Sequence, residues 1–545
     1  MALLNRLSAA ILLALAGTAA ALPALADGAA ASTINAAPVP AFNLERDVDS
    51  ALKTFDVPGI AIAIVKDGKV VATRGFGVRT LGQPAPVDAH TLFEIASNSK
   101  AFTATALSML VDQGRLSWDD PVTKHLPGFQ MYDSYVTGQM TVRDLLTHRS
   151  GLGLGAGDLL WWPTTTFSTD DIIHQLRYVK PATSFRASYA YDNLLYIVAG
   201  KIVADKAGKP WGEAIRAQIL QPLGMTDTTT SLAENAGKPD LASPHSKIND
   251  EIAVVKAMPV PNAVGAVGIN TSAADIARWM MVLLDGGKMD SVPGAAKGAR
   301  LFSAARGNDM WSAQTPIGIP PQNPALASIA PNFSAYGLGF QLRDYKGMKV
   351  VLHGGALQGF YSRVVMVPQA KLGIAILTNA ENSGSITALQ WRILDHYLNV
   401  APSDWIGTIS RIEQGQHRDE LAKVGKAADA RAAESTPSLP LAAYDGHYQD
   451  PWYGEVVIKH EGQKQILSFT RTPDLTGELV HFQHDSFIVH WKARNFNADA
   501  YVTFALNPDG SIDHVKMQPV SDETDFSYDF ADLLLTPVKP VPAPH

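Results

Sequence analysis

The chain has 545 residues, of which 46% are hydrophobic and 18% charged, and this composition is typical of a globular protein long enough for two or three domains. Its formal net charge of −7 comes without any basic cluster, which argues against nucleic acid as a partner. It contains no cysteine, which excludes disulfides, zinc-thiolate sites and cysteine nucleophiles.

The N-terminus, residues 1–26, is typical of a signal peptide. Arg6 precedes an apolar run, and residues 24–26 (Ala-Leu-Ala) fit a small-residue cleavage site. An uncleaved membrane anchor is the alternative, but the run is short for a span and contains Gly17 and Thr18. We therefore expect an exported protein without a stable membrane span after cleavage.

A linker over residues 27–40 precedes the first expected elements. Two apolar runs flank Asp67 and Gly68, which predicts a β-hairpin. Helical patterns with Gly/Pro loops fill residues 97–290, and strand patterns return in "MKVVLHGG", "YSRVVMVP" and "LGIAILTN", followed by a helix. This order predicts an α+β fold: an antiparallel sheet built from both ends of the region, flanked by helices and joined to a helical subdomain.

In the C-terminal part the pattern of apolar residues changes from a helical period to the alternation typical of strands. Residues 403–440 form a polar helical connector and linker, and residues 441–537 show short alternating strands separated by turn residues. We interpret the latter as a separate small all-β domain, barrel-like or a sandwich, followed by a tail at 538–545.

The stretch "FEIASNSKAFTATALSMLVDQGRL" places Ser97 and Lys100 three residues apart at the expected opening of a helix. On a helix these positions share a face. The helix N-terminus and apolar neighbours both favour a neutral lysine, which can accept the proton of a serine nucleophile. The alternative from these residues alone is an N-cap serine followed by a solvated lysine.

The wider segment favours the first interpretation. It resembles the active-site helix of the serine β-lactamase and penicillin-binding-protein superfamily, and most closely its class C-like branch of D-alanyl-D-alanine carboxypeptidases and esterases. The resemblance continues in "MTVRDLLTHRSGL", "PLGMTDTTTS", "VGINTSAADIARWM" and "YGLGF", so we assign residues 41–402 to a β-lactamase/transpeptidase-like domain. It implies that Ser97 is acylated and that Lys100 accepts its proton.

The family's Tyr-x-Asn element is matched by Tyr191 and Asn193. The resemblance implies that Tyr191 acts as general base and then protonates the leaving group, while Asn193 helps to hold the substrate. A phenolate at neutral pH needs a cationic neighbour, for which Lys100 is available. Tyr189 competes for the tyrosine role; we prefer Tyr191 because Asn193 follows at the right spacing and Tyr196 matches the next aromatic position.

The third element is Lys-Thr-Gly in β-lactamases of this group but His-x-Gly in many relatives, and here it is His353-Gly354-Gly355. Glycines let a substrate backbone lie against an edge strand. By analogy, the backbone N–H groups of Ala356 and Ser97 form the oxyanion hole. His353 then contributes polarity and a tunable charge. Histidine in place of lysine favours a peptidase or esterase over an antibiotic-degrading β-lactamase.

Other residues have simpler interpretations. His148 is expected to be a structural residue at a helix end, and the Trp161-Trp162 pair lines a substrate groove or caps a core, with neither favoured. His481 and His484 lie three apart on an expected strand, so they point to opposite faces and make a poor metal pair.

We therefore expect an exported, periplasmic or secreted, serine hydrolase that cleaves amides or esters through a Ser97 acyl-enzyme, with no metal or organic cofactor. D-amino-acid peptides or cell-wall fragments are the first substrate class, small esters the second and β-lactams the third. One rival is a non-turnover penicillin-binding sensor or scaffold. The other places the activity in the C-terminal domain, which resembles a lipocalin-like domain, as a carrier of small ligands. The oligomeric state stays open.

Overall fold

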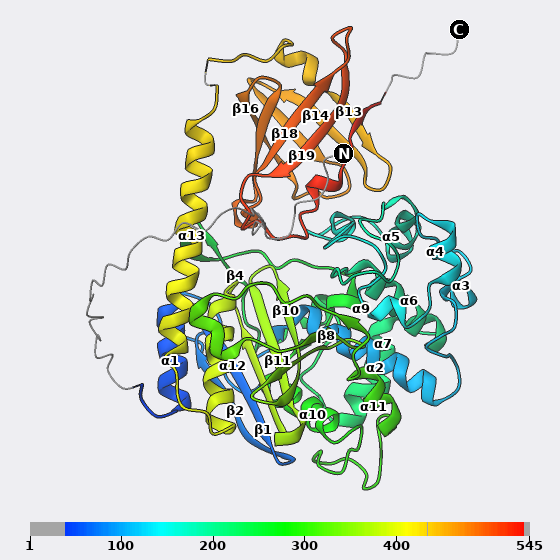
Figure 1. Cartoon of the computed structure of the whole chain (residues 1–545), viewed down its shortest axis with the longest axis vertical. Coiled ribbons are helices and arrows are strands. Elements are labelled where there is room, and N and C mark those ends of the chain that lie inside the picture. The colour runs from blue at the N-terminus through cyan, green and yellow to red at the C-terminus, as the bar shows by residue number, and fades with distance from the viewer. Residues whose placement is uncertain (1–38, 433, 539–545) are drawn as a thin grey trace, which may run out of the picture.

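The computed structural model describes residues 39–432 and 434–538, so the expected signal peptide lies outside the described residues. The expected α+β class is confirmed: a β-lactamase-like sheet with helices is followed by a barrel-like antiparallel domain. Figure 1 shows the barrel above the helical and sheet parts of the first domain, with the long helix α13 (Trp405–Asp429) running alongside both.

Eight strands of the described chain form the first sheet, in the order β2-β1-β12-β11-β10-β9-β8-β7, and every neighbouring pair is antiparallel. Strands from the two ends of the first domain meet in this sheet, because β1 pairs with β12 near its β2 edge. The strands are Gly59–Lys66 (β1), Lys69–Gly77 (β2), Thr315–Pro316 (β7), Ser334–Tyr336 (β8), Gln341–Tyr345 (β9), Met348–Leu357 (β10), Phe360–Val367 (β11) and Leu372–Thr378 (β12).

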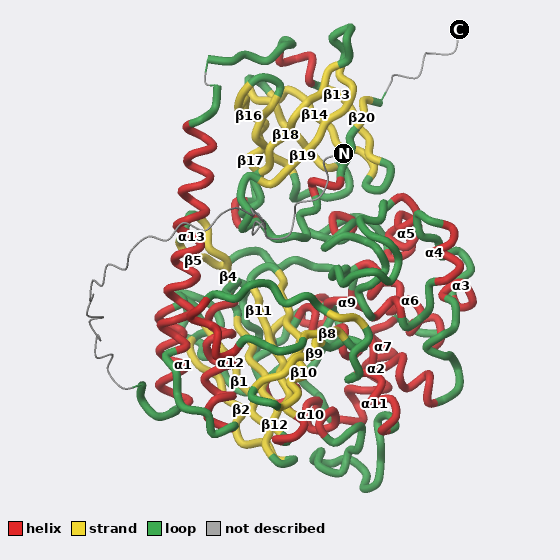
Figure 2. Tube along the Cα trace, in the orientation of Figure 1, coloured by secondary structure: helices red, strands yellow, loops and turns green. Residues whose placement is uncertain are grey.

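The sheet is buried on both faces, which explains why β1 reads as a continuous apolar run. Successive side chains of a strand point to opposite faces. Ile60, Ile62 and Ile64 belong to the core under α1 and α12, whereas Ala61 and Ala63 face the core under α10. Figure 2 shows α1 and α12 on one side of the strands and α2, α6 and α9 on the other.

Polar caps mark where several helices begin. The side chain of Ser272 accepts a hydrogen bond from the N–H of Asp275 at the start of α10, and Asp404 accepts one from the N–H of Gly407 at the start of α13. The helices, besides α13, are Leu44–Thr54 (α1), Ser99–Asp112 (α2), Val122–His125 (α3), Ser134–Gln139 (α4), Thr169–Gln175 (α5), Leu194–Ala207 (α6), Trp211–Ile215 (α7), Gln221–Leu223 (α8), Val264–Val267 (α9), Ala273–Leu284 (α10), Ala304–Met310 (α11) and Ser383–Tyr397 (α12). Among the described residues no helix has the length and apolar character needed to cross a membrane.

The C-terminal strands form a nearly closed barrel. They follow the order β19-β18-β17-β16-β15-β14-β13-β20, and two hydrogen bonds between Val515 and Leu535, 2.7 and 3.1 Å long, link β19 to the residue before β20. Buried aromatic rings pack its interior, among them Tyr444, Phe487 and Phe504. The strands are Gly446–Asp450 (β13), Gly454–Glu461 (β14), Lys464–Phe469 (β15), Thr476–Gln483 (β16), Ser486–Trp491 (β17), Ala500–Leu506 (β18), Ile512–Pro519 (β19) and Thr536–Pro537 (β20).

Four short strands form two further pairs, which are Phe93–Glu94 (β3) with Asn270–Thr271 (β6) and His245–Ile248 (β4) with Glu251–Val254 (β5).

A loop between β19 and β20, residues 521–529, joins the barrel to the first domain. We call it the barrel loop. One end is held by α13, because Glu420 accepts hydrogen bonds from the Ser521 hydroxyl (2.9 Å) and the Asp522 N–H (2.7 Å). The other end contacts the first domain: the carboxylate of Asp529 accepts a hydrogen bond from the N–H of Gly157 at 2.8 Å. The barrel loop is thus held at one end by helix α13 and at the other by the first domain.

Candidate active site

The expected nucleophile lies in a short 3-10 turn immediately before α2, one step earlier than the helix opening that the sequence suggested. Ser97 is only 9% exposed, and Ala96 before it has a left-handed backbone with φ of 46°. Strand β10 approaches this turn so closely that a Cβ on Gly355 would lie 2.0 Å from the carbonyl oxygen of Ile95. Glycine at this position therefore permits the strand and the nucleophile turn to meet.

Lys100, in the first turn of α2, is fully buried and contacts the nucleophile. Its Nζ lies 2.8 Å from Ser97 Oγ and 2.7 Å from Asn193 Oδ1. Burial lowers the pKa of Lys100 to about 7, although the carboxylates of Asp158 and Asp192 act in the opposite direction. The amine is therefore neutral in a large fraction of molecules near neutral pH and can accept a proton from the Ser97 hydroxyl.

Of the two candidate tyrosines, Tyr191 lies at the nucleophile. Lys100 Nζ stands 4.8 Å from the centre of its ring, whereas the neighbours of Tyr189 are the rings of His148 and Tyr336. Burial raises the pKa of Tyr191 well above its ordinary value, and the adjacent Ser97 hydroxyl opposes this only in part. The structure therefore favours a protonated Tyr191 over the phenolate considered from the sequence, because burial outweighs the hydrogen bond with Ser97.

Asn193 connects the lysine to a buried carboxylate that the sequence did not single out. Its Nδ2 donates a hydrogen bond to Asp158 Oδ2 at 2.8 Å, which turns its Oδ1 towards Lys100. Asp158 also accepts a hydrogen bond from the indole N–H of Trp161 at 2.8 Å. Burial raises the pKa of Asp158 to about 7, against the effect of these donors.

His353, on β10, faces the same pocket as a neutral ring. Its Nε2 lies 2.8 Å from the Tyr336 hydroxyl, and its Nδ1 lies 2.5 Å from the carbonyl oxygen of Gly354. A carbonyl only accepts, so the network assigns the proton to Nδ1 and makes Nε2 the acceptor from Tyr336. Burial and then the charge of Lys100 lower the pKa of His353 to about 3, so the tunable charge expected from the sequence is absent at neutral pH.

His148 has a larger part in the site than its expected role at a helix end. It is buried just beyond a 3-10 turn, and its ring lies 4.3 Å from the Tyr191 ring and 4.5 Å from the Tyr336 ring. Its Nδ1 accepts a hydrogen bond from the Asp192 N–H at 3.2 Å. The His148 ring thus packs against the Tyr191 ring and holds the backbone of the next residue, Asp192, through a hydrogen bond.

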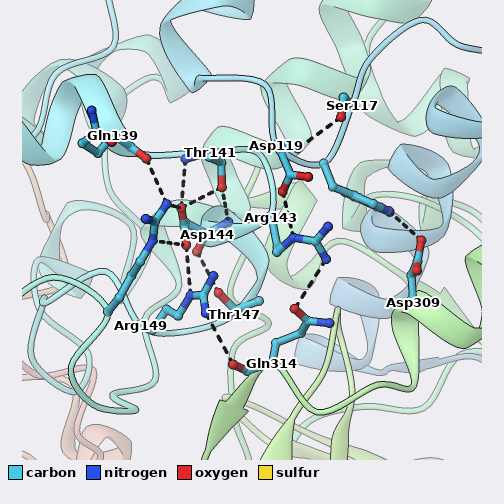
Figure 3. A network of polar contacts seen from close by, with 12 residues as sticks. Ser117, Asp119, Gln139, Thr141, Arg143, Asp144, Thr147, Arg149, Asp309 and Gln314 are labelled. Carbon is cyan, nitrogen blue, oxygen red and sulfur yellow. Dashed lines mark hydrogen bonds and ion pairs between the residues drawn. The ribbon is translucent and has the colours of Figure 1, made fainter.

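A buried carboxylate holds the segment that carries His148. Asp144 accepts hydrogen bonds from Arg149 Nε (2.9 Å), Arg186 Nε (3.0 Å) and the Thr141 hydroxyl (2.7 Å). Figure 3 shows Asp144 beside Thr141 and Arg149, and Arg149 also donates a hydrogen bond to the carbonyl oxygen of Gln314 at 3.4 Å. The network therefore connects the segment from Asp144 to Arg149, which carries His148, to Gln314, the residue before β7.

Most of the expected site residues line one pocket with a volume of about 470 Å³. For Trp161 and Trp162 the sequence left open a substrate groove or a core. Both tryptophans line this pocket, and both are also buried. The expected site residues that line it are Ser97, Tyr191, Asn193, His353, Gly354, Gly355 and Ala356. Lys100 lies beneath them, in contact with Ser97.

The barrel loop supplies another wall of the pocket, through Asp525, Phe526 and Ser527. The ring of Phe526 lies 6.1 Å from that of Tyr191, and a Cβ on Gly155 would lie 2.6 Å from it. Sequence reasoning missed this loop, together with Asp158. The loop residues have no local motif, because they reach the site only through the docking of one domain on another, and Asp158 is a single buried carboxylate that no motif marks.

The remaining histidines considered from the sequence lie in the barrel. His481 is in β16 and His484 in the turn after it, where His481 Nε2 lies 2.9 Å from the carbonyl oxygen of His484. This contact is part of the hairpin turn.

Comparison with known proteins agrees with this architecture. A solved structure, the octameric penicillin-binding protein homologue from Pyrococcus abyssi, has the same fold, with a TM-score of 0.56 at 21% identity, over 90% of this chain and 99% of that one. Penicillin-binding protein 4 of Amycolatopsis lactamdurans is 31% identical over 340 residues, which is 60% of this chain and 83% of that protein.

Another relative is similar to this chain over a longer stretch, which includes the barrel. The unguisins hydrolase ungD' of Aspergillus campestris (strain IBT 28561) is 29% identical over 495 residues, covering 85% of this chain and 86% of that protein. Residues 430–537 match a domain of unknown function, DUF3471, and residues 44–398 match the Beta-lactamase family model. With that match over most of its length, the chain belongs to the Beta-lactamase family.

Proposed function

We propose that the protein is a serine hydrolase that cleaves an amide or ester bond through an acyl-enzyme on Ser97. The observation that carries the proposal is the 2.8 Å contact between Ser97 Oγ and the buried amine of Lys100, at the base of a pocket with aromatic walls. The similarity to proteins named for hydrolysis and penicillin binding supports the same reaction class.

In acylation, neutral Lys100 takes the proton of the Ser97 hydroxyl as Oγ attacks the carbonyl carbon. The N–H groups of Ser97 and Ala356 stabilise the oxyanion. The proton then passes from Lys100 through the Tyr191 hydroxyl to the leaving group, since Tyr191 is protonated and its ring centre lies 4.8 Å from Lys100 Nζ. Water then attacks the acyl carbon, and its proton passes through Tyr191 and Lys100 to Ser97 Oγ as the ester bond breaks, which releases the acid and free Ser97.

The backbone of β10 offers a place for an extended substrate. Its pairing with β9 ends at Leu352, whereas its pairing with β11 continues to Leu357. The residues from His353 to Leu357 therefore have no pairing with β9, and Gly354 and Gly355 among them line the pocket. A peptide can align along this stretch as an added strand. This geometry favours peptide-like substrates.

The pocket also presents a cationic group and a carboxyl group. Arg363 on β11 keeps its positive charge, although burial and then Arg343 lower its pKa to about 10, and Asp525 of the barrel loop supplies a carboxyl group. Groups of both kinds suit a substrate with charged ends. We therefore place D-amino-acid peptides or cell-wall fragments first, small esters second and β-lactams third.

A substrate panel tests this order. A D-alanine anilide, its L-enantiomer, p-nitrophenyl acetate and a chromogenic cephalosporin are compared on the wild type and on Ser97→Ala. We expect turnover of the D-anilide and the ester that disappears in the variant. A stable cephalosporin adduct without turnover of any compound would instead support the sensor or scaffold function.

The aromatic wall from the barrel loop leads to a prediction about acyl-group preference. Phe526→Ala removes apolar surface from the mouth of the pocket, so kcat/KM for p-nitrophenyl hexanoate should fall by about fivefold while that for the acetate changes less than about twofold. Phe482→Ala, on β16 outside the pocket lining, is the matched control. An unchanged ratio of the two esters would show that Phe526 does not contact the acyl chain.

Export of the protein remains part of the proposal. It rests on the signal-peptide pattern of residues 1–26. Expression of the full chain in a bacterial host, followed by N-terminal sequencing of the periplasmic fraction, should give a chain that begins at Asp27. Recovery of only the intact N-terminus from the cytoplasm would contradict it.

A further inference from the structure

The barrel loop reaches the catalytic network through a single hydroxyl. Ser527 Oγ donates a hydrogen bond to Asp158 Oδ2 at 2.9 Å, on the same oxygen that accepts from Asn193 Nδ2 at 2.8 Å. Ser527 and Asp158 are both buried, at 5% and 0% exposure. A continuous chain of hydrogen bonds therefore runs from the C-terminal domain to the nucleophile.

We propose that Ser527 is a positioning residue for the nucleophile: it holds the Asp158 carboxylate, which orients the amide of Asn193 and through it the amine of Lys100. The inference rests on the proposed function, because it assumes that Ser97 is activated by Lys100. It makes the barrel domain a component of the active site.

The orientation of Asn193 is the central step. An amide presents an oxygen on one side and an NH2 group on the other, and the two are close in shape. A carboxylate only accepts, so ionised Asp158 requires the NH2 group of Asn193 on its side and leaves Oδ1 for Lys100. A protonated Asp158 removes this requirement, and a flipped Asn193 then presents hydrogen atoms to the Lys100 amine, which disturbs its contact with Ser97.

Ser527 favours the ionised carboxylate. Three side-chain donors, from Trp161, Asn193 and Ser527, oppose the effect of burial on the pKa of Asp158. The titratable groups that face this carboxylate are Lys100 from α2, Tyr191, and Asp529 from the barrel loop. The competent state has lost the protons of both Asp158 and Lys100, and the hydrogen bond that Ser527 donates stabilises the ionised form of Asp158 over the protonated one.

The test measures the rate at which a fluorophosphonate labels Ser97 between pH 5.5 and 9.5, which requires no knowledge of the substrate. For Ser527→Ala we expect the midpoint of the rate profile to move up by about one pH unit, with labelling about tenfold slower at pH 7 and close to wild type at high pH. Ser527→Thr keeps the hydroxyl and should restore the wild-type profile.

The matched control is Ser511→Ala, since Ser511 also donates to a carboxylate, Asp509 Oδ1 at 2.6 Å, but in a turn outside the pocket lining. A Ser527→Ala profile identical to the wild type and to Ser511→Ala overturns the inference while leaving the proposed function intact. A loss that is equal at every pH and is not restored by threonine also overturns it, because it indicates general damage. Absence of labelling in the wild type at every pH overturns the proposed function and the inference together.

Discussion

Replacing Lys100 by methionine is expected to slow the acylation of Ser97 by about 10²- to 10⁴-fold, which is the contribution of a well-placed general base. The side chain is fully buried and its Nζ lies 2.8 Å from Ser97 Oγ. Methionine has a similar length and suits an apolar site, so the fold should be retained. The variant separates loss of the base from loss of structure.

The pH dependence provides a second measurement on the same protein. Burial lowers the pKa of Lys100 to about 7, so the fraction of neutral amine rises with pH and levels off above that value. Wild-type labelling by a fluorophosphonate should follow this rise, and Lys100→Met should lose it. Lys53→Met, on an exposed position of α1, is the control. A Lys100→Met rate within threefold of wild type would contradict the assignment of Lys100 as the base.

Replacing Asp144 by alanine is expected to lower the free energy of unfolding of the first domain by about 3 kcal/mol, near the lower end for breaking a buried ion pair. The carboxylate is fully buried, whereas its partners Arg149 and Arg186 keep part of their surface in water, which moderates the loss. Urea unfolding followed by tryptophan fluorescence should show an earlier first transition.

Asp119→Ala is the matched control, because Asp119 also pairs with an arginine, Arg143, at 3.2 Å, but is 75% exposed (Figure 3). Exposed ion pairs contribute about 0–1 kcal/mol, so the unfolding midpoint of Asp119→Ala should barely move.

Hydrogen bonds, chiefly from Arg186, hold the pKa of Asp144 below its ordinary range against the effect of burial. Its contribution is therefore complete above the ordinary aspartate pKa and lost as the pH falls through the lowered one. Equal effects of the two substitutions at pH 7 would contradict the assigned role of Asp144.

The features that could be predicted from the sequence are those that short local residue patterns determine. The hairpin around Asp67 and Gly68 follows from two apolar runs and a turn dipeptide, and β1 and β2 pair there. The Ser97–Lys100 contact follows from a three-residue spacing at a helix start. The hairpin follows from its own few residues, whereas the choice of a catalytic Ser97–Lys100 pair over an N-cap serine with a solvated lysine also needed the resemblance of the wider segment.

Features that depend on burial or on docking could not be predicted in this way. The ionisation of Tyr191 and His353 depends on how completely other segments cover them, and no local pattern measures that coverage. Ser527 lies 369 positions from Asp158 in the chain, so its contact arises only when the barrel packs on the first domain. A hydroxyl in a loop has no local signal for such a role.

The central claim is that Ser97 is an activated nucleophile, and intact-mass spectrometry after incubation with a fluorophosphonate tests it most directly. We predict one adduct per chain in the wild type, located at Ser97 by peptide mapping, and none in Ser97→Ala. Folded wild-type protein without an adduct, or an adduct that persists in Ser97→Ala, would contradict the account.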